Sequence, residues 1–195
     1  MTSFDALAAN LGPADPRPAK HRAAVAVVLR EGSSGFEVLL MRRAQRDGDP
    51  WSGDVSCPGG FEDPGDAGPA AAAIRETREE LGLDLSTARL LGGLPDRPAA
   101  PWRWMAPFSV TPVVFAVRGD PPLSLEPSEV ASARWIPLGL VADRRNHEGF
   151  WFPWRPGQRW PVRVPVRVAR VRHLDFEVWG LTFNVLRALC ARLPR

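Results

Sequence analysis

The sequence of 195 residues predicts a mixed α/β domain, because segments typical of strands alternate with two segments typical of helices. Its length suits one hydrophobic core. Apolar residues make up 45% of the chain and charged residues 24%, as in ordinary globular proteins. We expect residues 1–20 to form a leader with a short helix, and residues 21–195 to form a single domain.

The domain begins with a predicted β-hairpin. Residues 22–31 (RAAVAVVLRE) and 35–44 (GFEVLLMRRA) are rich in apolar residues and flank the turn sequence EGSSG. Residues 46–69 are rich in Gly, Pro and Asp, and a connection of this length in a compact domain usually carries function. The alanine-rich segment that follows predicts a helix with Pro69 in its first turn and Gly82 just past its end.

The second half of the chain predicts more strands and a closing helix. Three segments typical of strands are 88–94, 108–117 and 131–138. Pro112 predicts a bulge or an edge position, since proline donates no hydrogen bond to a neighbouring strand. Valine alternates with arginine or proline over residues 160–171, which predicts another strand. Residues 176–193 have apolar residues at helical spacing and predict an amphipathic helix.

The composition argues against several classes of partner. The formal net charge of +3 is too small to indicate nucleic-acid binding, and the arginine-rich stretch 155–172 contains no known reading motif. No apolar run reaches the length of a membrane span, and the first residues lack a signal-peptide pattern. Cys57 and Cys190 lack metal-ligand spacing and are interpreted as reduced, buried thiols. We therefore expect a cytoplasmic protein with neither nucleic-acid nor membrane partners.

The sequence RETREELG carries the most specific chemical signal. Glu76, Glu79 and Glu80 share one face of the predicted helix, because residues three and four apart are neighbours on a helix. A solvated acidic face is one interpretation. The alternative is a site for a hard divalent cation such as Mg²⁺, which prefers oxygen ligands and offsets the repulsion. The upstream sequence PGGFEDPGD favours the metal, because Gly59 and Gly60 let the backbone approach a metal or phosphate closely.

Residues 60–83 resemble the Nudix box, whose general form is G-x(5)-E-x(7)-R-E-U-x-E-E-x-G-U, with U apolar. Gly60 starts the motif in this chain, and RETREELGL completes it. Asp66 stands where the first glutamate is usual, and eight residues rather than seven separate it from Arg75. Thr77 occupies a position that is usually apolar.

The aspartate with its one-residue insertion resembles the coenzyme A diphosphatase branch of this family. That branch also carries a stretch like LLxRRS…GDVSFPGG before the box, and residues 39–60 read LLMRRAQRDGDPWSGDVSCPGG, with Cys57 in place of phenylalanine. Residues 129–138 and 178–193 resemble a later strand and the closing helix of the same branch. The resemblance implies a Nudix-type α/β/α sandwich with a mixed central sheet, as a monomer or homodimer.

The implied activity is Mg²⁺-dependent hydrolysis, with Mn²⁺ as a substitute, of coenzyme A or acyl-coenzyme A to 4′-phosphopantetheine and 3′,5′-ADP. One alternative is hydrolysis of nucleoside triphosphates or other nucleoside diphosphate-linked substrates. Another is a non-catalytic nucleotide-binding module. The presence of all three box glutamates disfavours the second alternative.

The resemblance also implies roles for the box residues. Glu76, Glu79 and Glu80 would bind metal, with the Gly60 carbonyl as a further ligand. Arg75 lies four residues before Glu79 and would hold its carboxylate in place. For the general base, Glu79 is the first candidate and Glu129 the second.

The substrate phosphates need cationic partners, and Arg42 and Arg43 are the candidates that the resemblance implies, with Arg46 a weaker one. Gly59 and Gly60 would approach the substrate through their backbone. Trp51 would either stack on a base or pack its loop shut. Asp66 would support the loop and the start of the helix. Four further residues are interpreted as solvent-facing: His147, Glu148, Arg163 and Arg167.

Overall fold

The computed structural model describes residues 3–14, 21–49, 51–99, 108–151 and 167–194. The strands are β1 (Arg22–Gly32), β2 (Gly35–Arg43), β3 (Val55–Ser56), β4 (Gly59–Phe61), β5 (Arg89–Gly93), β6 (Arg97–Ala99), β7 (Phe108–Ala116), β8 (Val130–Pro137), β9 (Glu148–Trp151), β10 (Arg167–His173) and β11 (Phe176–Trp179). The helices are α1 (Ser3–Ala8), α2 (Pro69–Leu81), α3 (Leu138–Ala142), the 3-10 turn η1 (Arg144–Asn146) and α4 (Gly180–Cys190). The predicted hairpin and the predicted helix before Gly82 are confirmed as β1–β2 and α2.

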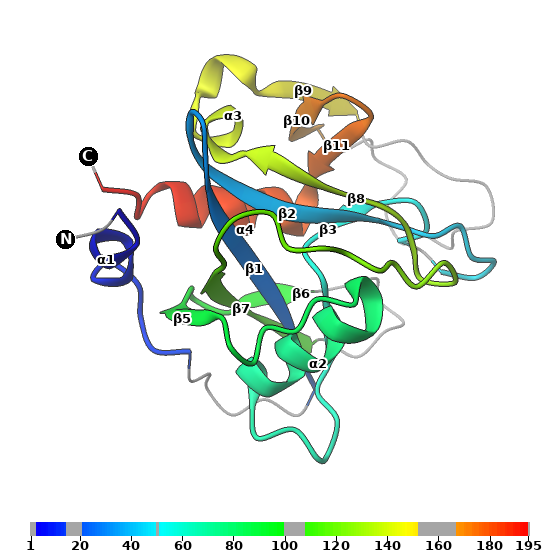
Figure 1. Ribbon diagram of the computed structural model, residues 1–195. Coiled ribbons are helices and arrows are strands. Elements are labelled where there is room, and N and C mark those ends of the chain that lie inside the picture. Colours follow the sequence, from blue (N-terminus) through cyan, green and yellow to red (C-terminus); the bar gives the residue numbers. More distant parts are fainter. Residues whose placement is uncertain (1–2, 15–20, 50, 100–107, 152–166, 195) are drawn as a thin grey trace.

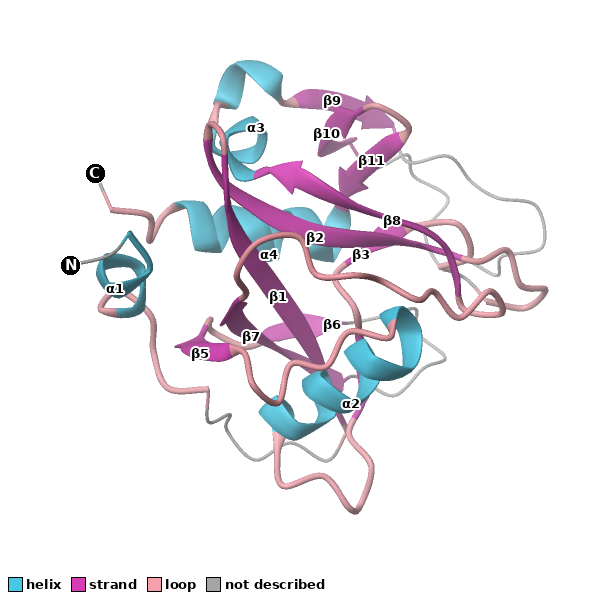
Figure 2. Cartoon of the chain, viewed as in Figure 1, coloured by secondary structure: helices cyan, strands magenta, loops and turns pink. Residues whose placement is uncertain are grey.

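The central sheet is organised around β1 (Figures 1 and 2). One edge of β1 pairs with β7 in parallel along its length. The other edge is shared: β2 pairs antiparallel with residues 29–32 and β4 with residues 23–25. β8 and β3 extend the sheet beyond β2, and β5 and β6 pair with β7. The sheet is therefore mixed, as predicted, and β4 forms a short local edge beside β1.

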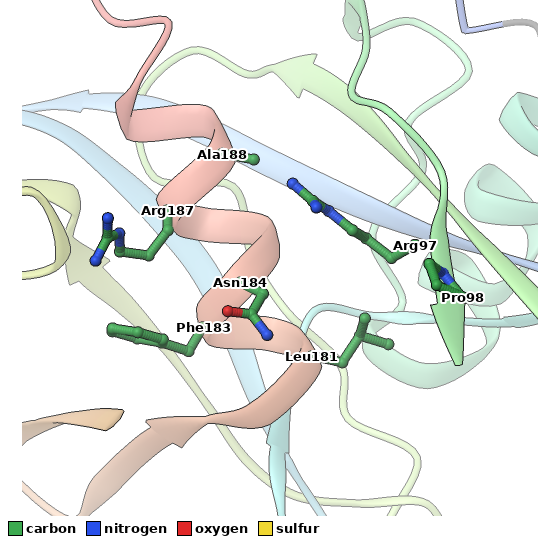
Figure 3. A pocket seen from close by; sticks show the side chains of 7 residues that line it. All are labelled: Arg97, Pro98, Leu181, Phe183, Asn184, Arg187 and Ala188. Atoms are coloured by element: carbon green, nitrogen blue, oxygen red, sulfur yellow. The ribbon is translucent and has the colours of Figure 1, made fainter. Parts of the chain in front are cut away.

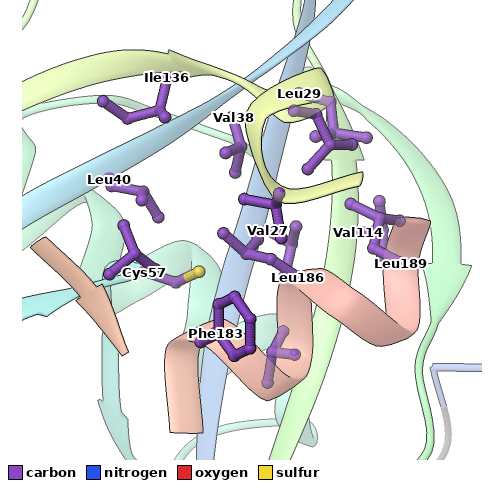
Figure 4. Close-up of a cluster of buried hydrophobic side chains, with 14 of the residues drawn as sticks. Val27, Leu29, Val38, Leu40, Cys57, Val114, Ile136, Phe183, Leu186 and Leu189 are labelled. Atoms are coloured by element: carbon purple, nitrogen blue, oxygen red, sulfur yellow. The ribbon is translucent and has the colours of Figure 1, made fainter. Parts of the chain in front are cut away.

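Alternation along β1 divides the core into two layers. Ala24, Ala26 and Val28 pack with apolar residues of α2, in what we call the α2-side core. Val27 and Leu29 pack with residues of α4 and of the small β9–β11 sheet, in the α4-side core (Figure 4). The helices thus cover opposite faces of the sheet, which confirms the predicted α/β/α sandwich. None of the helices in the described ranges is long and apolar enough to cross a membrane.

The last predicted helix begins later than its apolar spacing indicates. Residues 176–179 form β11, in which Phe176 and Val178 are buried, and α4 starts only at Gly180. Gly180 has a φ of 60°, a conformation that suits glycine and separates the strand from the helix. The prediction of a helix for residues 176–179 was wrong, because the apolar residues of this short segment fit both the helical period of 3.6 and the strand period of two.

The prediction for Pro112 also needs correction. β7 pairs on both sides and is not an edge strand. Pro112 lies opposite the interruption between β5 and β6, and its carbonyl accepts the N–H of Leu94 at 3.0 Å. The irregularity in pairing falls in the neighbouring β5, between Leu90 and Gly92.

Part of the expected leader packs on the sheet. Leu7 of α1 is fully buried in the α4-side core. Gly12 and Gly93 exchange backbone hydrogen bonds of 3.1 and 2.8 Å, which join residues after α1 to β5. Three residues of the second half of the chain lie outside the described ranges: Trp154, Trp160 and Arg163. Trp151 is described and is exposed in β9.

Both cysteines are free thiols, as predicted. Cys57 is buried beside Leu40 and Phe183 (Figure 4). Burial raises the pKa of the Cys57 thiol to about 12 and that of the half-buried Cys190 to about 11. Cys57 therefore fills core volume rather than acting as a nucleophile.

Candidate active site

Helix α2 carries the glutamate cluster, by which we mean Glu76, Glu79 and Glu80. Pro69 occupies its first turn, and Gly82 ends it in the left-handed conformation with a φ of 64°. Ala72, Ala73 and Leu81 face the sheet. This orientation buries Glu80, which is 3% exposed, and leaves Glu79 open to solvent, with a side chain that is 54% exposed.

Glu80 is a buried carboxylate without an ion pair among the described residues. It accepts the Gly59 N–H of β4 at 2.8 Å. Burial raises its pKa to about 8, and the nearby charges of Glu76 and Glu129 act in the same direction. Arg43 opposes this rise from a neighbouring position. The positive charge of Arg43 and the hydrogen bond from Gly59 therefore do not offset the effect of burial on Glu80.

Glu76 faces the second glycine of β4. A Cβ atom added at Gly60 would lie 2.5 Å from Glu76 Oε1, so no larger residue fits there without displacing the carboxylate. Burial raises the pKa of Glu76 above its usual value, although Arg75 acts against the shift. Gly59 and Gly60 thus bring the β4 backbone directly against two of the three box glutamates.

Arg75 connects the helix to the loop that precedes it. Its guanidinium group bonds Glu76 at 2.9 Å, Glu79 at 3.0 Å and Asp66 at 3.0 Å. It also donates to the Phe61 carbonyl at 3.0 Å. The contact between Arg75 and Glu79 that the sequence predicts is therefore present.

Asp66 and Thr77, the two departures from the box, both have partners. Hydrogen bonding from Arg75 holds the pKa of Asp66 below its usual range, and Asp66 accepts the Asp63 N–H at 2.8 Å. Asp66 thereby orders the loop before α2. The Thr77 hydroxyl is buried and donates to the Ala73 carbonyl at 2.6 Å, so this helix position remains compatible with the core.

Glu129, which precedes β8, lies beside the cluster. Its carbonyl accepts the Ala44 N–H at 2.8 Å, and this bond joins the loop before β8 to the residue after β2. Its carboxylate pairs with Arg46 at 3.1 Å, and its charge raises the pKa of both Glu76 and Glu80. Glu129 thus lies close enough to Glu76 and Glu80 for its charge to act on both carboxyl groups.

The two predicted phosphate-binding arginines point to opposite faces of the sheet. Arg43 follows Met41 onto the α2 side and pairs with Asp49 at 2.7 Å. Arg42 faces the α4 side, where it lies 5.3 Å from the Phe176 ring centroid and pairs with Asp175 at 3.3 Å. Period-two alternation therefore separates Arg42 from the glutamate cluster.

The other predicted residues lie farther from the cluster or in supporting roles. The Trp51 N–H donates to Asp49 at 2.9 Å, and its side chain is half-buried in the loop after β2. His147 packs edge-on against Phe183 at 5.1 Å. Glu148 pairs with Arg170 at 3.3 Å. These contacts of His147 and Glu148 belong to the α4 side of the fold.

The acidic residues fit a divalent cation in charge and chemistry. In the described ranges, no group of three acidic, histidine or cysteine side chains is arranged to hold a metal ion, and Glu79 is turned toward Arg75. However, burial raises the pKa values of Glu80 and of the half-buried Glu76. A cation bound by Glu76 and Glu80 would favour the charged form of both carboxyl groups.

Comparison with known proteins identifies the family. The NUDIX domain profile matches residues 20–154, more than half of the chain. The chain is 31% identical over 142 residues to the uncharacterized Nudix hydrolase NudL of Escherichia coli, covering 73% of this chain and 68% of that protein. The chain belongs to the Nudix family. It is a Nudix hydrolase, and the glutamate cluster with Gly60 is its Nudix box.

Other relatives place limits on this assignment. An uncharacterized protein of Schizosaccharomyces pombe is 39% identical over 104 residues, which are 52% of this chain but only 32% of that protein. The chain thus spans about a third of that relative's length. The Nudix hydrolase RenU of M. smegmatis superposes with a TM-score of 0.52 at 23% identity, covering 63% and 74% of the two chains. The C. elegans Ap4A hydrolase complex gives 0.51 at 23% identity, covering 61% and 81%. At this identity the structural likeness concerns the fold alone.

Substitution of Gly60 tests the close approach of β4 to the Nudix helix. We expect Gly60→Ala to lower kcat by about 10²-fold, because the added Cβ displaces the Glu76 carboxylate. Gly65→Ala is the matched control, since no atom lies within 4 Å of the place that its added methyl group would occupy. Steady-state kinetics measures kcat for both variants. An equal kcat in Gly60→Ala and Gly65→Ala would show that the close approach of Gly60 to Glu76 does not matter for activity.

The buried Glu80 predicts a pH-dependent stability in the metal-free Nudix hydrolase. Its folded-state pKa is about 8 against a usual value of 4.5, so the folded state holds this proton more tightly than the unfolded state. This contribution to the free energy of unfolding is complete below pH 4.5 and is lost as the pH rises through 8.

We therefore expect the thermal midpoint to fall between about pH 5 and about pH 9 by more in the wild type than in Glu80→Gln. Calorimetry in the presence of a chelator measures this difference. Glu31→Gln, the same substitution at an exposed position at the far end of β1, should follow the wild-type profile. Parallel pH profiles for the wild type and Glu80→Gln would show that Glu80 does not carry the effect.

Proposed function

We propose that this Nudix hydrolase cleaves the diphosphate of coenzyme A or acyl-coenzyme A to 4′-phosphopantetheine and 3′,5′-ADP, with Mg²⁺ as its cofactor. The burial of Glu80 and Glu76 against the backbone of Gly59 and Gly60 is the observation that supports metal-dependent hydrolysis, because a cation would favour the charged form of both carboxyl groups. The coenzyme A specificity rests on the resemblance of residues 39–60 and on Asp66 with its one-residue insertion. Asp66 pairs with Arg75 at 3.0 Å, so it connects the loop to the Nudix helix despite the one-residue insertion between them.

The chemistry requires charge neutralisation and a positioned water at one phosphorus. Glu76, Glu80 and the Gly60 carbonyl would hold Mg²⁺, with Glu79 completing the set. The cation would offset the phosphate charge and lower the pKa of an attacking water. Arg43 and Arg46 lie at the same end of β2 and would attract the substrate phosphates. Arg75 positions Glu76 and Glu79 through its ion pairs.

Two carboxylates compete for the role of general base. Glu79 is open to solvent and held by Arg75, whereas Glu129 enters from the loop before β8 and is held by Arg46. A general base must reach the attacking water, directly or through one more water. We keep Glu79 as the first candidate and Glu129 as the second, because both carboxylates belong to segments that meet at the cluster.

The substrate is expected to be a small nucleotide, without nucleic-acid or membrane partners, and the protein a monomer or homodimer. The free thiols of Cys57 and Cys190 support a reducing, cytoplasmic location.

A substrate panel tests the proposed specificity. Purified protein with Mg²⁺ is incubated with coenzyme A, ADP-ribose, NADH, Ap4A and dNTPs, and the products are separated by chromatography. We expect coenzyme A to give 3′,5′-ADP with the highest kcat/KM, and Glu80→Gln to give no product. Faster cleavage of another compound would contradict the coenzyme A assignment and retain the hydrolase. A rate unchanged in Glu80→Gln would contradict the metal role.

A pair of amide substitutions distinguishes the two candidate bases. Loss of a general base typically lowers kcat by about 10² to 10⁴-fold, and Glu79→Gln is expected to fall in this range. Glu129→Gln should lower kcat by less, because Glu129 would then act mainly through its charge. The pH dependence of kcat reports the base directly: its acidic limb should disappear only in the variant that removes the base. A larger loss in Glu129→Gln would assign the role to Glu129.

A further inference from the structure

A row of side chains crosses the central sheet on its α4 side. Phe61 of β4 pairs in register with Ala23 of β1, Ala23 with Val110 of β7, and Val110 with Arg97 of β6. Register partners share a face of a sheet, and Ala23 has the same parity as Val27 of the α4-side core. Phe61 and Arg97 therefore face the same side, three strand spacings or about 14 Å apart, with only small or medium apolar residues between them.

Arg97 lies in a cavity of about 630 Å³ between β6 and α4. Figure 3 shows its side chain extending from β6 toward the helix, with Leu181 and Asn184 on the facing turns. The Arg97 Nε atom is buried and has no hydrogen-bond partner among the described residues. Within the same ranges, no carboxylate pairs with Arg97, in contrast to Arg43, Arg46 and Arg75 of the active site. A buried donor of this kind is unfavourable until water or a ligand satisfies it.

Phe61 marks the other end of the row, next to the active site. Its carbonyl is held by Arg75, and it follows Gly60, which abuts Glu76. Its ring is 51% exposed and lies 5.0 Å from the Phe108 ring at an angle of 56°. Phe108 is half-buried, so Phe61 provides most of the exposed aromatic surface, on which a nucleobase can stack. The same short strand thus presents glycine to the glutamates and an aromatic ring to the opposite face.

We propose that this face binds the nucleoside half of the substrate, with the base on Phe61 and Phe108 and a phosphate monoester of the ribose on Arg97. The proposal rests on the proposed function and deepens it. The adenosine of coenzyme A carries a 3′-phosphate, which ADP-ribose, NADH and Ap4A lack. A guanidinium group without a carboxylate partner is suited to a phosphate monoester, which it binds through charge-assisted hydrogen bonds. Arg97 would then select coenzyme A among nucleoside diphosphate-linked compounds.

The test compares coenzyme A with dephospho-coenzyme A, which differs only by the 3′-phosphate. In the wild type we expect a higher kcat/KM for coenzyme A. In Arg97→Gln the ratio of the two kcat/KM values should fall by at least about tenfold, through KM, because one charge-assisted contact is lost. Phe61→Leu should raise KM for both compounds and leave their ratio unchanged. Arg118→Gln, at an exposed arginine just beyond the other end of β7, is the control.

An unchanged ratio in Arg97→Gln, with coenzyme A still hydrolysed by the wild type, would overturn the inference and leave the proposed function standing. Failure of the wild type to hydrolyse coenzyme A would overturn the proposed function. In that case, calorimetric titration with 3′,5′-ADP and 5′-AMP decides the inference without turnover. Tighter binding of 3′,5′-ADP that disappears in Arg97→Gln supports it, and equal affinities overturn it. Circular dichroism and the thermal midpoint of each variant verify that it is folded.

Discussion

The hydrogen bond from the Gly59 N–H to Glu80 is the contact on which the active site depends. It fixes the Nudix helix against β4, at a point where the Gly59 backbone lies close to β1. A Cβ at Gly59 would lie 2.2 Å from the Ala24 carbonyl oxygen, and the φ of 147° also requires glycine. The buried carboxylate has no ion-pair partner in the described ranges. The fold therefore buries a carboxyl group whose charged form a bound cation would stabilise.

Alternation along short strands decides what each face of the sheet can do. Gly60 meets the glutamates on the α2 side, while Phe61 faces the α4 side. Arg43 likewise lies on the α2 side and Arg42 on the α4 side, so these adjacent arginines pair with different residues, Asp49 and Asp175. Arg42 therefore lies on the face of the sheet opposite the glutamate cluster, whereas Arg43 lies on the same face.

Much of this architecture could be predicted from the sequence, because it depends on local patterns. The first hairpin and the Nudix helix follow from periodicity and from Pro69 and Gly82. The beginning of α4 could not be predicted, since residues 176–179 fit both periods. The alignment of Phe61 with Arg97 depends on register across four strands that are distant in sequence. No local signal indicates such a register, and the resemblance alone placed Arg42 beside Arg43 without separating their faces.

Direct measurement of metal binding tests whether Glu76 and Glu80 hold a divalent cation. Mn²⁺ is titrated into chelator-treated protein and the free ion is followed by electron paramagnetic resonance, without any substrate. We predict saturable Mn²⁺ binding in the wild type and in Glu31→Gln, and its loss in Glu80→Gln. Equal Mn²⁺ binding by the wild type and folded Glu80→Gln, or no binding by the wild type, would show that Glu80 is not a metal ligand.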